Sequence, residues 1–212
     1  MKYTIICALD PGVSGGITIL DGDKEPKLYR IPVENIVVNK KSKKEYDLKG
    51  VVGILEPYRG KNVLYVQERV GVMPGQGGVS NFNFGKSAGS TFGIATALGF
   101  DTVVVSPSTW KKMFPELNDG TEDFRQEIKD LKKIQKTITG KTKKDIEQKK
   151  ENKKLIEKLG RKVKSIAKTN ARMLVSKLYP SLVDNFKQVN EDGVAESLLM
   201  ALYGKEKQDE LV

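Results

Sequence analysis

Hydrophobic runs of strand length fill the first third of the chain. Residues 3–10 (YTIICALD) form a short apolar run that ends in an acid, and residues 15–33 contain two more β-rich runs around Asp21-Gly22-Asp23. A turn of this composition between apolar runs favours a hairpin. We therefore expect three consecutive antiparallel strands over residues 3–33, followed by a polar, lysine-rich loop over 34–47.

The middle of the chain alternates between helical and strand patterns. A helix is predicted near 47–58, a strand over 62–68 (NVLYVQE), a helix from about 83 to 98 and a strand over 101–107 (DTVVVSP). A short helix in STWKKMF is expected to begin at Ser108 or Thr109. Hairpins followed by α/β units predict an α/β fold with a mixed five-stranded sheet flanked by helices.

The last third begins with a long charged region. Residues 119–168 have only weak apolar periodicity and are expected to form exposed helices, with a hairpin or arm as one arrangement. A helix ending at Pro180 and a final amphipathic helix closed by Gly204 follow. We expect a single domain over residues 1–212, with a basic helical insertion at about 119–164.

The charge of the chain is strongly basic and unevenly distributed. The formal net charge is +10, and residues 141–164 contain 11 Lys/Arg against 4 Asp/Glu, a net +7. Such an excess indicates a polyanionic partner such as nucleic acid. A solvated helix face or an insertion without a partner explains the charge run equally well. An anionic membrane is disfavoured because the segment lacks a large apolar face.

The residue types that the chain lacks exclude several kinds of catalytic and metal-binding site. The chain has no histidine and only Cys7, which excludes Ser–His and Cys–His catalysis, histidine-containing zinc sites and intramolecular disulfides. Any metal must be held mainly by oxygen ligands, which favours Mg²⁺ or Mn²⁺. No apolar run reaches about 18 residues, and the N-terminal run meets an acid too early for a signal peptide. We expect an intracellular protein.

Four acids occupy positions where they can converge. Asp10 and Glu68 each end a predicted strand, and Asp192 and Glu196 lie one turn apart on the final helix. If the two strands are neighbours and the helix crosses them, the four carboxylates repel one another unless divalent cations neutralise them. Each acid alone has an ordinary explanation as a turn, strand-end or surface residue, so the hypothesis rests on their joint occurrence.

Three blocks of the sequence resemble the RuvC-like Holliday-junction resolvases of the phage and chloroplast types, which belong to the ribonuclease-H-like superfamily. The blocks are ALDPGVSGGITIL; the segment from LYVQERVGVMPGQGG to SPSTWKKMF, with its "PGQG" loop; and the closing segment from KTNARMLVSKLYP to NEDGVAESLLMALYG. Together they cover roughly residues 1–115 and 165–205. The resemblance implies a ribonuclease-H-like fold and gives no counterpart for residues 119–164.

The resemblance also implies an activity. It assigns Asp10, Glu68, Asp192 and Glu196 as catalytic residues and ligands of two Mg²⁺ ions, with Mn²⁺ able to substitute. The reaction would be hydrolysis of four-way DNA junctions to 5′-phosphate ends, in DNA recombination and repair, by a homodimer whose twofold symmetry matches the junction. The helix at 83–99 is our candidate for the dimer seam. Two departures are a final Glu where many relatives have Asp and a four-residue spacing, so that Glu191 competes with Asp192 for the ligand role.

Several residues are candidates for DNA contact. Lys111 and Lys112 beside Trp110 combine phosphate neutralisation with stacking, although Trp110 is equally interpretable as a core anchor. The loop from Gly71 to Phe84 carries Phe82 and Phe84 toward a junction centre, unless these side chains are buried. Further phosphate contacts are expected from Lys86, Lys168 and Arg172.

Three other functions compete with the junction nuclease. The first is a ribonuclease-H-like nuclease acting on RNA or RNA–DNA hybrid, which the same carboxylates would serve. The second is an ATP-binding protein of the actin and sugar-kinase superfamily, disfavoured by the length of the chain and its single Asp-x-Gly turn. The third is a non-catalytic junction-binding protein, disfavoured because all four acids are present.

Overall fold

A five-stranded mixed sheet forms the centre of the molecule. The computed structural model describes residues 2–38, 40–72, 77–140 and 142–211. The strand order is β3 (Lys27–Arg30), β2 (Gly16–Asp21), β1 (Ile5–Asp10), β6 (Val63–Glu68) and β7 (Asp101–Val105). The first three strands of the chain are antiparallel, whereas β6 and β7 run parallel to β1. The predicted mixed sheet is confirmed.

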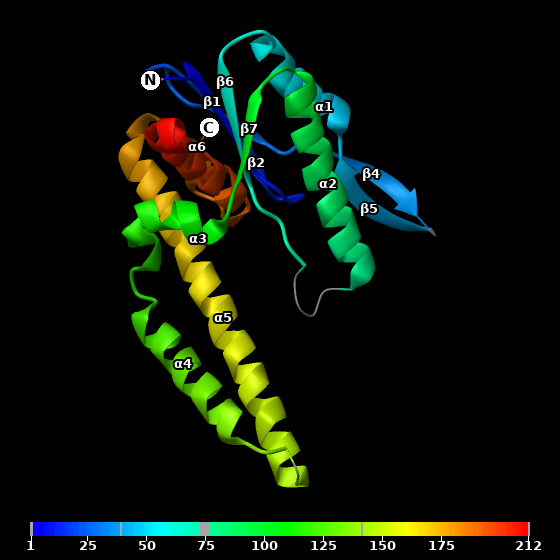
Figure 1. Ribbon diagram of the computed structural model, residues 1–212, viewed down its shortest axis with the longest axis vertical. Helices are drawn as coiled ribbons and strands as arrows, with labels where there is room; N and C mark the ends of the chain where they lie inside the picture. Colours follow the sequence, from blue (N-terminus) through cyan, green and yellow to red (C-terminus); the bar gives the residue numbers. More distant parts are fainter. Residues whose placement is uncertain (1, 39, 73–76, 141, 212) are drawn as a thin grey trace.

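The sheet is covered by helices on both faces (Figure 1). Alternate residues of β1 divide between two cores: Ile5, Cys7 and Leu9 pack toward α1 (Leu48–Leu55) and α2 (Gly78–Ala97), while Ile6 and Ala8 pack toward α6 (Asp192–Leu211). Successive side chains of a strand point to opposite faces, so an unbroken apolar run suits a strand that is buried on both sides.

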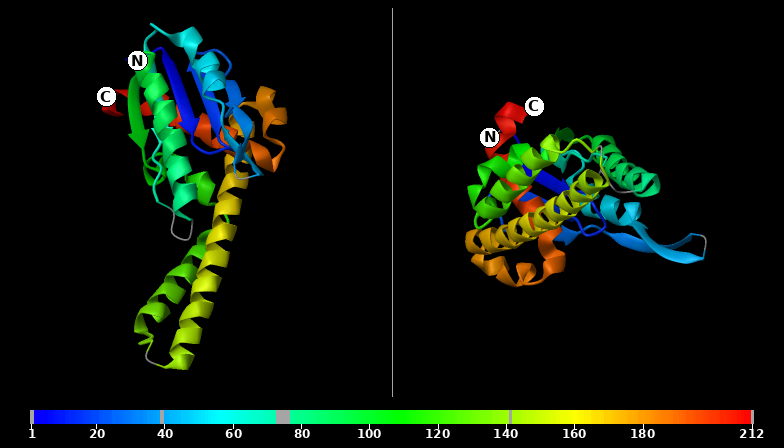
Figure 2. Two further views of the ribbon diagram at one scale, coloured as in Figure 1. Left: turned by 90° about the vertical axis from the view of Figure 1, so that its right-hand side faces the viewer. Right: turned by 90° about the horizontal axis from the view of Figure 1, so that it is seen from below.

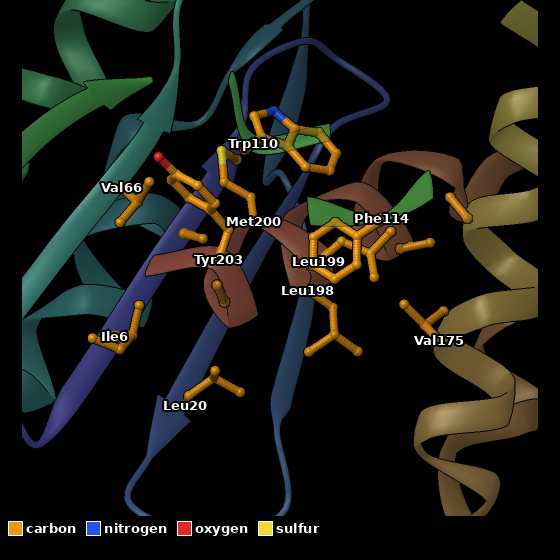
Figure 3. Close-up of a cluster of buried hydrophobic side chains, with 14 of the residues drawn as sticks. Ile6, Leu20, Val66, Trp110, Phe114, Val175, Leu198, Leu199, Met200 and Tyr203 are labelled. Atoms are coloured by element: carbon orange, nitrogen blue, oxygen red, sulfur yellow. The ribbon is translucent and has the colours of Figure 1, made fainter. Parts of the chain in front are cut away.

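The core on the α6 side joins elements from the whole chain (Figure 3). Leu198, Leu199 and Met200 of α6 lie in one buried cluster with Val175 of α5 (Lys143–Leu178) and with Trp110, the last residue of α3 (Pro107–Trp110). Thr18 of β2 and Ser197 of α6 share a buried hydrogen bond of 2.8 Å. These contacts hold α6 across the middle of the sheet.

The charged region forms a helical arm. Helix α4 (Glu122–Thr137) and the first half of α5 lie against each other and project away from the sheet, and α5 then continues into the core (Figures 1 and 2). Asn170 of α5 ties the base of the arm by donating to the backbone oxygens of Glu116 and Asp119, at 3.1 and 2.9 Å. That the chain is a single domain with an insertion stays a prediction.

The lysine-rich segment at 34–47, predicted as a loop, is instead largely a hairpin. Strands β4 (Val33–Val38) and β5 (Lys41–Tyr46) pair with each other in a separate two-stranded sheet, with Val33 opposite Tyr46. Backbone pairing needs no apolar face, and lysine is common on strands that remain outside a larger sheet. Periodicity alone therefore missed this hairpin.

Three helix boundaries also differ from the predictions. Helix α2 begins at Gly78 rather than near residue 83. Helix α3 is capped by Ser106, whose hydroxyl accepts a hydrogen bond from the backbone of Thr109 at 3.2 Å, because Pro107 is suited to the first helical position. Helix α6 continues beyond Gly204, which is buried against Val66 and Ile6 and provides close packing instead of an end.

Short 3-10 helices connect several of these elements. They are η1 (Glu56–Tyr58), η2 (Lys111–Met113), η3 (Pro115–Asn118), η4 (Pro180–Phe186) and η5 (Val189–Glu191). None of the described helices combines the length and apolar content that crossing a membrane requires.

Candidate active site

Asp10 and Glu68 end two neighbouring parallel strands. The register of β1 and β6 pairs Leu9 with Gln67, so the next residue of each strand is an acid at the same edge of the sheet. Both acids are half-buried. The sequence prediction that these two side chains share one edge thus follows from the parallel pairing.

Three glycines bring the start of α6 to this edge. Gly15, in the turn after Asp10, forms a β-bridge with Gly193 at the start of α6. A Cβ on Gly193 would lie 2.3 Å from the backbone oxygen of Ser14, and one on Gly16 would lie 2.5 Å from Cα of Val194. Only residues without a side chain permit this approach, which brings the two acids of α6 to the strand-end acids.

The two acids of α6 have different partners. Glu196 lies close enough to Asp10 and Glu68 for its charge to raise the pKa of both, and it accepts a hydrogen bond from Lys111. Asp192 instead forms ion pairs with Arg172 and, at 3.6 Å, with Lys168. The site therefore has three acids in one cluster, while the fourth is paired with cations of α5.

Glu191, the competing ligand candidate, is held elsewhere. It forms an ion pair with Arg30 of β3, in which Nε of Arg30 donates to Oε2 of Glu191 at 3.2 Å. In this arrangement the Glu191 carboxylate is paired with β3.

Burial and mutual repulsion perturb the acids. Burial raises the pKa of Asp10 well above its usual value, and the charges of Glu196 and Glu68 raise it further. Burial also raises the pKa of Glu68, partly offset by the Lys111 ammonium and by the indole N–H of Trp110, which donates to Glu68 at 2.9 Å. A cation placed among these acids would stabilise their ionised forms.

Lys111 supplies such a charge within the chain. Burial alone would lower the pKa of Lys111, but Glu196, Glu68 and Asp10 outweigh it and the net pKa is raised. The ammonium also lies 4.9 Å from the centre of the Trp110 ring. Lys111 therefore remains protonated and partly neutralises the cluster.

The side chains of the acidic cluster suit a divalent metal by the chemistry of their donor atoms, but not by their arrangement in this structure. Half-buried carboxylates that repel one another are the hard oxygen donors that Mg²⁺ and Mn²⁺ prefer. Within the part of the chain that the structure describes, however, no group of three or more Asp, Glu, Cys or His side chains is arranged to hold an ion. The donors fit, while their arrangement in this structure does not enclose a metal.

The residues of the PSTWKK segment that were predicted to contact DNA have different environments in the structure. Trp110 is fully buried and lies edge-on to Phe114, so the core-anchor interpretation is supported and stacking on a base is not. Lys111 faces the acids, whereas Lys112 is exposed. The sequence alone did not show that Trp110 and Lys111 belong to the acidic cluster, because neither contact is local.

The other predicted contacts lie on α2 and α5. Phe82 is 69% exposed, contrary to the burial considered for it, and Phe84 is half-buried. Lys86 pairs with Glu45 at 3.2 Å beside a groove of about 390 Å³ between α2 and the β4–β5 hairpin. Most of the "PGQG" loop falls at 73–76, outside the described residues.

Comparisons with known proteins bear on the fold. No family model and no curated protein matches the sequence. The similar solved structures include Thermus thermophilus RuvC in complex with a Holliday junction substrate, with 9% identity, a TM-score of 0.44 and coverage of 98% of this chain and 96% of that one. Another structure of Thermus thermophilus RuvC has 10% identity, a TM-score of 0.44 and coverage of 97% and 96%. The likeness to these structures concerns the fold alone.

Proposed function

We propose that this protein is a metal-dependent endonuclease that cuts branched DNA, in particular four-way junctions, to leave 5′-phosphate ends. The observation that carries the proposal is the cluster of Asp10, Glu68 and Glu196 at one sheet edge. Acids that repel one another are a poor arrangement for stability, but they suit a site that holds divalent cations against a phosphate. The net charge of +10 supports a polyanionic substrate.

The residues of the cluster have distinct proposed roles. Asp10, Glu68 and Glu196 would hold Mg²⁺, or Mn²⁺ in its place; when bound, such ions lower the pKa of water and stabilise charge on the phosphate. Trp110 orients the Glu68 carboxylate through its indole N–H. Lys111 restrains Glu196 and offsets the negative charge of the cluster.

Asp192 is proposed as the fourth ligand. It lies one helical turn before Glu196, and Lys168, its partner at 3.6 Å, also lowers the pKa of Asp10 and Glu68. Asp192 is therefore adjacent to the cluster, but the ion pair with Arg172 must weaken before it acts as a ligand. We expect replacement of Asp192 to reduce cleavage less than replacement of Asp10.

A homodimer belongs to the same proposal, because a twofold dimer matches the symmetry of a four-way junction. The seam proposed at α2 is supported by two exposed apolar side chains, Val79 at 67% and Phe82 at 69% exposure. Replacement of both by Ser should yield a monomer in light scattering if α2 is the seam. A variant that remains dimeric would leave Phe82 as a candidate DNA contact instead.

The deciding experiment compares Asp10→Asn with the wild type on a synthetic four-way junction, with and without Mg²⁺. We expect symmetric cuts by the wild type with Mg²⁺, and loss of cleavage with retained binding in the variant. Asp23→Asn, at a turn residue whose side chain is 96% exposed, is the matched control and should cut normally. Unchanged cutting by Asp10→Asn would reject the site.

The same assay, run on other nucleic acids, distinguishes the alternative functions. Parallel incubations with an RNA–DNA hybrid and with single-stranded RNA distinguish a junction nuclease from another ribonuclease-H-like nuclease. Junction binding by the wild type without any cleavage in Mg²⁺ or Mn²⁺ would favour the non-catalytic alternative.

A further inference from the structure

Helix α5 carries a regular stripe of cationic side chains. Six of them are spaced at intervals of seven and four residues: Lys143, Lys150, Lys154, Arg161, Lys168 and Arg172. Because an α-helix turns every 3.6 residues, these positions fall within about 40° of one another around the helix axis. We call this set the α5 stripe.

The outer part of the stripe faces solvent. Lys143, Lys150, Lys154 and Arg161 are all exposed, and among the described residues no acidic side chain forms an ion pair with any of them. Leu159, the buried residue of this half of α5, lies on the opposite side of the helix. The stripe is therefore not required for packing of the arm.

The inner end of the stripe reaches the acidic cluster. Lys168 and Arg172 bind Asp192, and the charge of Lys168 also lowers the pKa of Asp10. Beside them is a recess of about 270 Å³, lined by four cations and two hydroxyls of α5 together with Val189 and Asp192. Four cations against one carboxylate favour an anion in this recess.

We propose that the α5 stripe holds the sugar–phosphate backbone of one duplex arm of the substrate as that arm leaves the acidic cluster. This inference rests on the proposed function and assigns a role to the arm. From Lys143 to Arg172 the helix rises about 44 Å, at 1.5 Å per residue. That length corresponds to about 13 base pairs of duplex, at 3.4 Å each.

The chemistry of the stripe indicates a backbone contact rather than base recognition. Solvent-exposed cations spaced along one helix face repel one another and gain free energy when phosphates neutralise them and release counterions. Lysine and arginine contacts to phosphate position the nucleic acid without reading its sequence. The stripe should therefore increase affinity for longer duplex arms of any sequence.

The test uses a variant of the full chain in which Lys143, Lys150, Lys154 and Arg161 are replaced by Gln. A control variant of equal charge replaces four exposed lysines away from the stripe, namely Lys49, Lys129, Lys132 and Lys136. Binding to junctions with arms of about 8 and about 20 base pairs is measured in EDTA over a salt series. Cleavage with Mg²⁺ at saturating DNA is measured in parallel.

We expect the stripe variant to lose most of the affinity that the wild type gains from longer arms. Its plot of log affinity against log salt should be shallower by about 3 to 4, at about 0.9 per lost phosphate contact. The control should follow the wild type in affinity, in salt slope and in cleavage rate.

Equal slopes and equal arm-length dependence for the two variants would overturn the stripe proposal, even with cleavage intact. A wild-type protein that neither binds nor cuts any junction would overturn the proposed function together with the stripe. If binding depends on the α5 stripe but no cleavage occurs, the stripe proposal is supported and the proposed nuclease function is rejected.

Discussion

Gly193 at the start of α6 forms a β-bridge with Gly15, five residues after Asp10. This backbone contact places the helix that carries Asp192 and Glu196 against the strand end that carries Asp10. The relative position of the acids is thus set by glycines that have no chemical role of their own.

Gly193→Ala should reduce both stability and cleavage. The new Cβ would lie 2.3 Å from the backbone oxygen of Ser14, so the helix or the turn must shift. We expect a loss of about 1–3 kcal/mol in the free energy of unfolding, as for other overpacked sites, and a larger fall in cleavage than in junction binding.

Gly53→Ala is the matched control for that variant. Gly53 lies in α1 with open space around its Cβ position. The change should stabilise the protein by about 0.5–1 kcal/mol, because alanine has less backbone freedom to lose on folding. Wild-type cleavage by Gly193→Ala would contradict the role assigned to the close approach.

Asp10→Asn should make the metal-free protein more stable at neutral pH. The folded-state pKa of Asp10 is raised, so ionisation above the unfolded pKa costs stability, and that stability returns as pH falls through the raised pKa. In EDTA at pH 7 the variant should melt at least about 2 °C higher, the effect of roughly 1 kcal/mol in a chain of this size. The difference should narrow on going to pH 4, and a variant that melts below the wild type at pH 7 would count against the electrostatic account.

Lys111→Gln should destabilise the protein in a manner that depends on the same acids. The pKa of Lys111 is raised, so Lys111 stays protonated from acidic pH to beyond its ordinary pKa. Its stabilising effect nevertheless weakens as pH falls, because Asp10 and Glu68 then lose the charge that it compensates. The side chain of Lys111 is 34% exposed, and we therefore expect about 1–3 kcal/mol at pH 8.

This loss should shrink toward pH 4 in thermal unfolding, and it should be smaller when Asp10→Asn is also present. The double variant measures the coupling between the two residues directly. Equal destabilisation at pH 4 and pH 8 would indicate lost packing rather than lost charge compensation.

Trp110→Phe should reduce cleavage beyond its effect on stability. The change removes the donor to Glu68 at 2.9 Å and leaves unfilled space in a fully buried position. We expect about 1–3 kcal/mol of lost stability and about a tenfold lower cleavage rate, equivalent to one hydrogen bond to a charged group.

Phe114→Leu separates these two effects. Phe114 packs edge-on against Trp110 in the same core, but it has no polar contact with the acids. A comparable loss of stability with an unchanged cleavage rate at saturating DNA is the expected result. Equal loss of rate in the two variants would show that packing, rather than the contact with Glu68, governs the site.

Local patterns account for the parts of the fold that were predicted correctly. The apolar run of β1, the Asp21-Gly22-Asp23 turn and the strand ending at Glu68 are each encoded within a few residues, because strand pairing and turn chemistry depend on local composition. Parallel pairing then places Asp10 and Glu68 together. The glycines at 15, 16 and 193 were a usable signal for the approach of α6, since Gly193 directly follows Asp192 and the other two lie five and six residues after Asp10.

The β4–β5 hairpin and the continuation of α6 past Gly204 were not predictable in this way. The lysine-rich strand β5 (KSKKEY) lacks an alternating apolar face, and the packing of Gly204 against Val66 and Ile6 exists only once helix and sheet meet. At Gly204 a contact between segments distant in the sequence overrides the local preference for a helix end.

By itself, the sequence determined the mixed sheet, the set of acids and the basic charge of residues 141–164, since composition and periodicity act over short distances. Only the tertiary structure decided that Glu196 joins Asp10 and Glu68, that Asp192 pairs with Arg172, and that Trp110 and Lys111 belong to the cluster. The reason is physical: charge pairing and burial depend on which side chains meet in space, and residues twenty or more positions apart meet only through the packing of the whole chain.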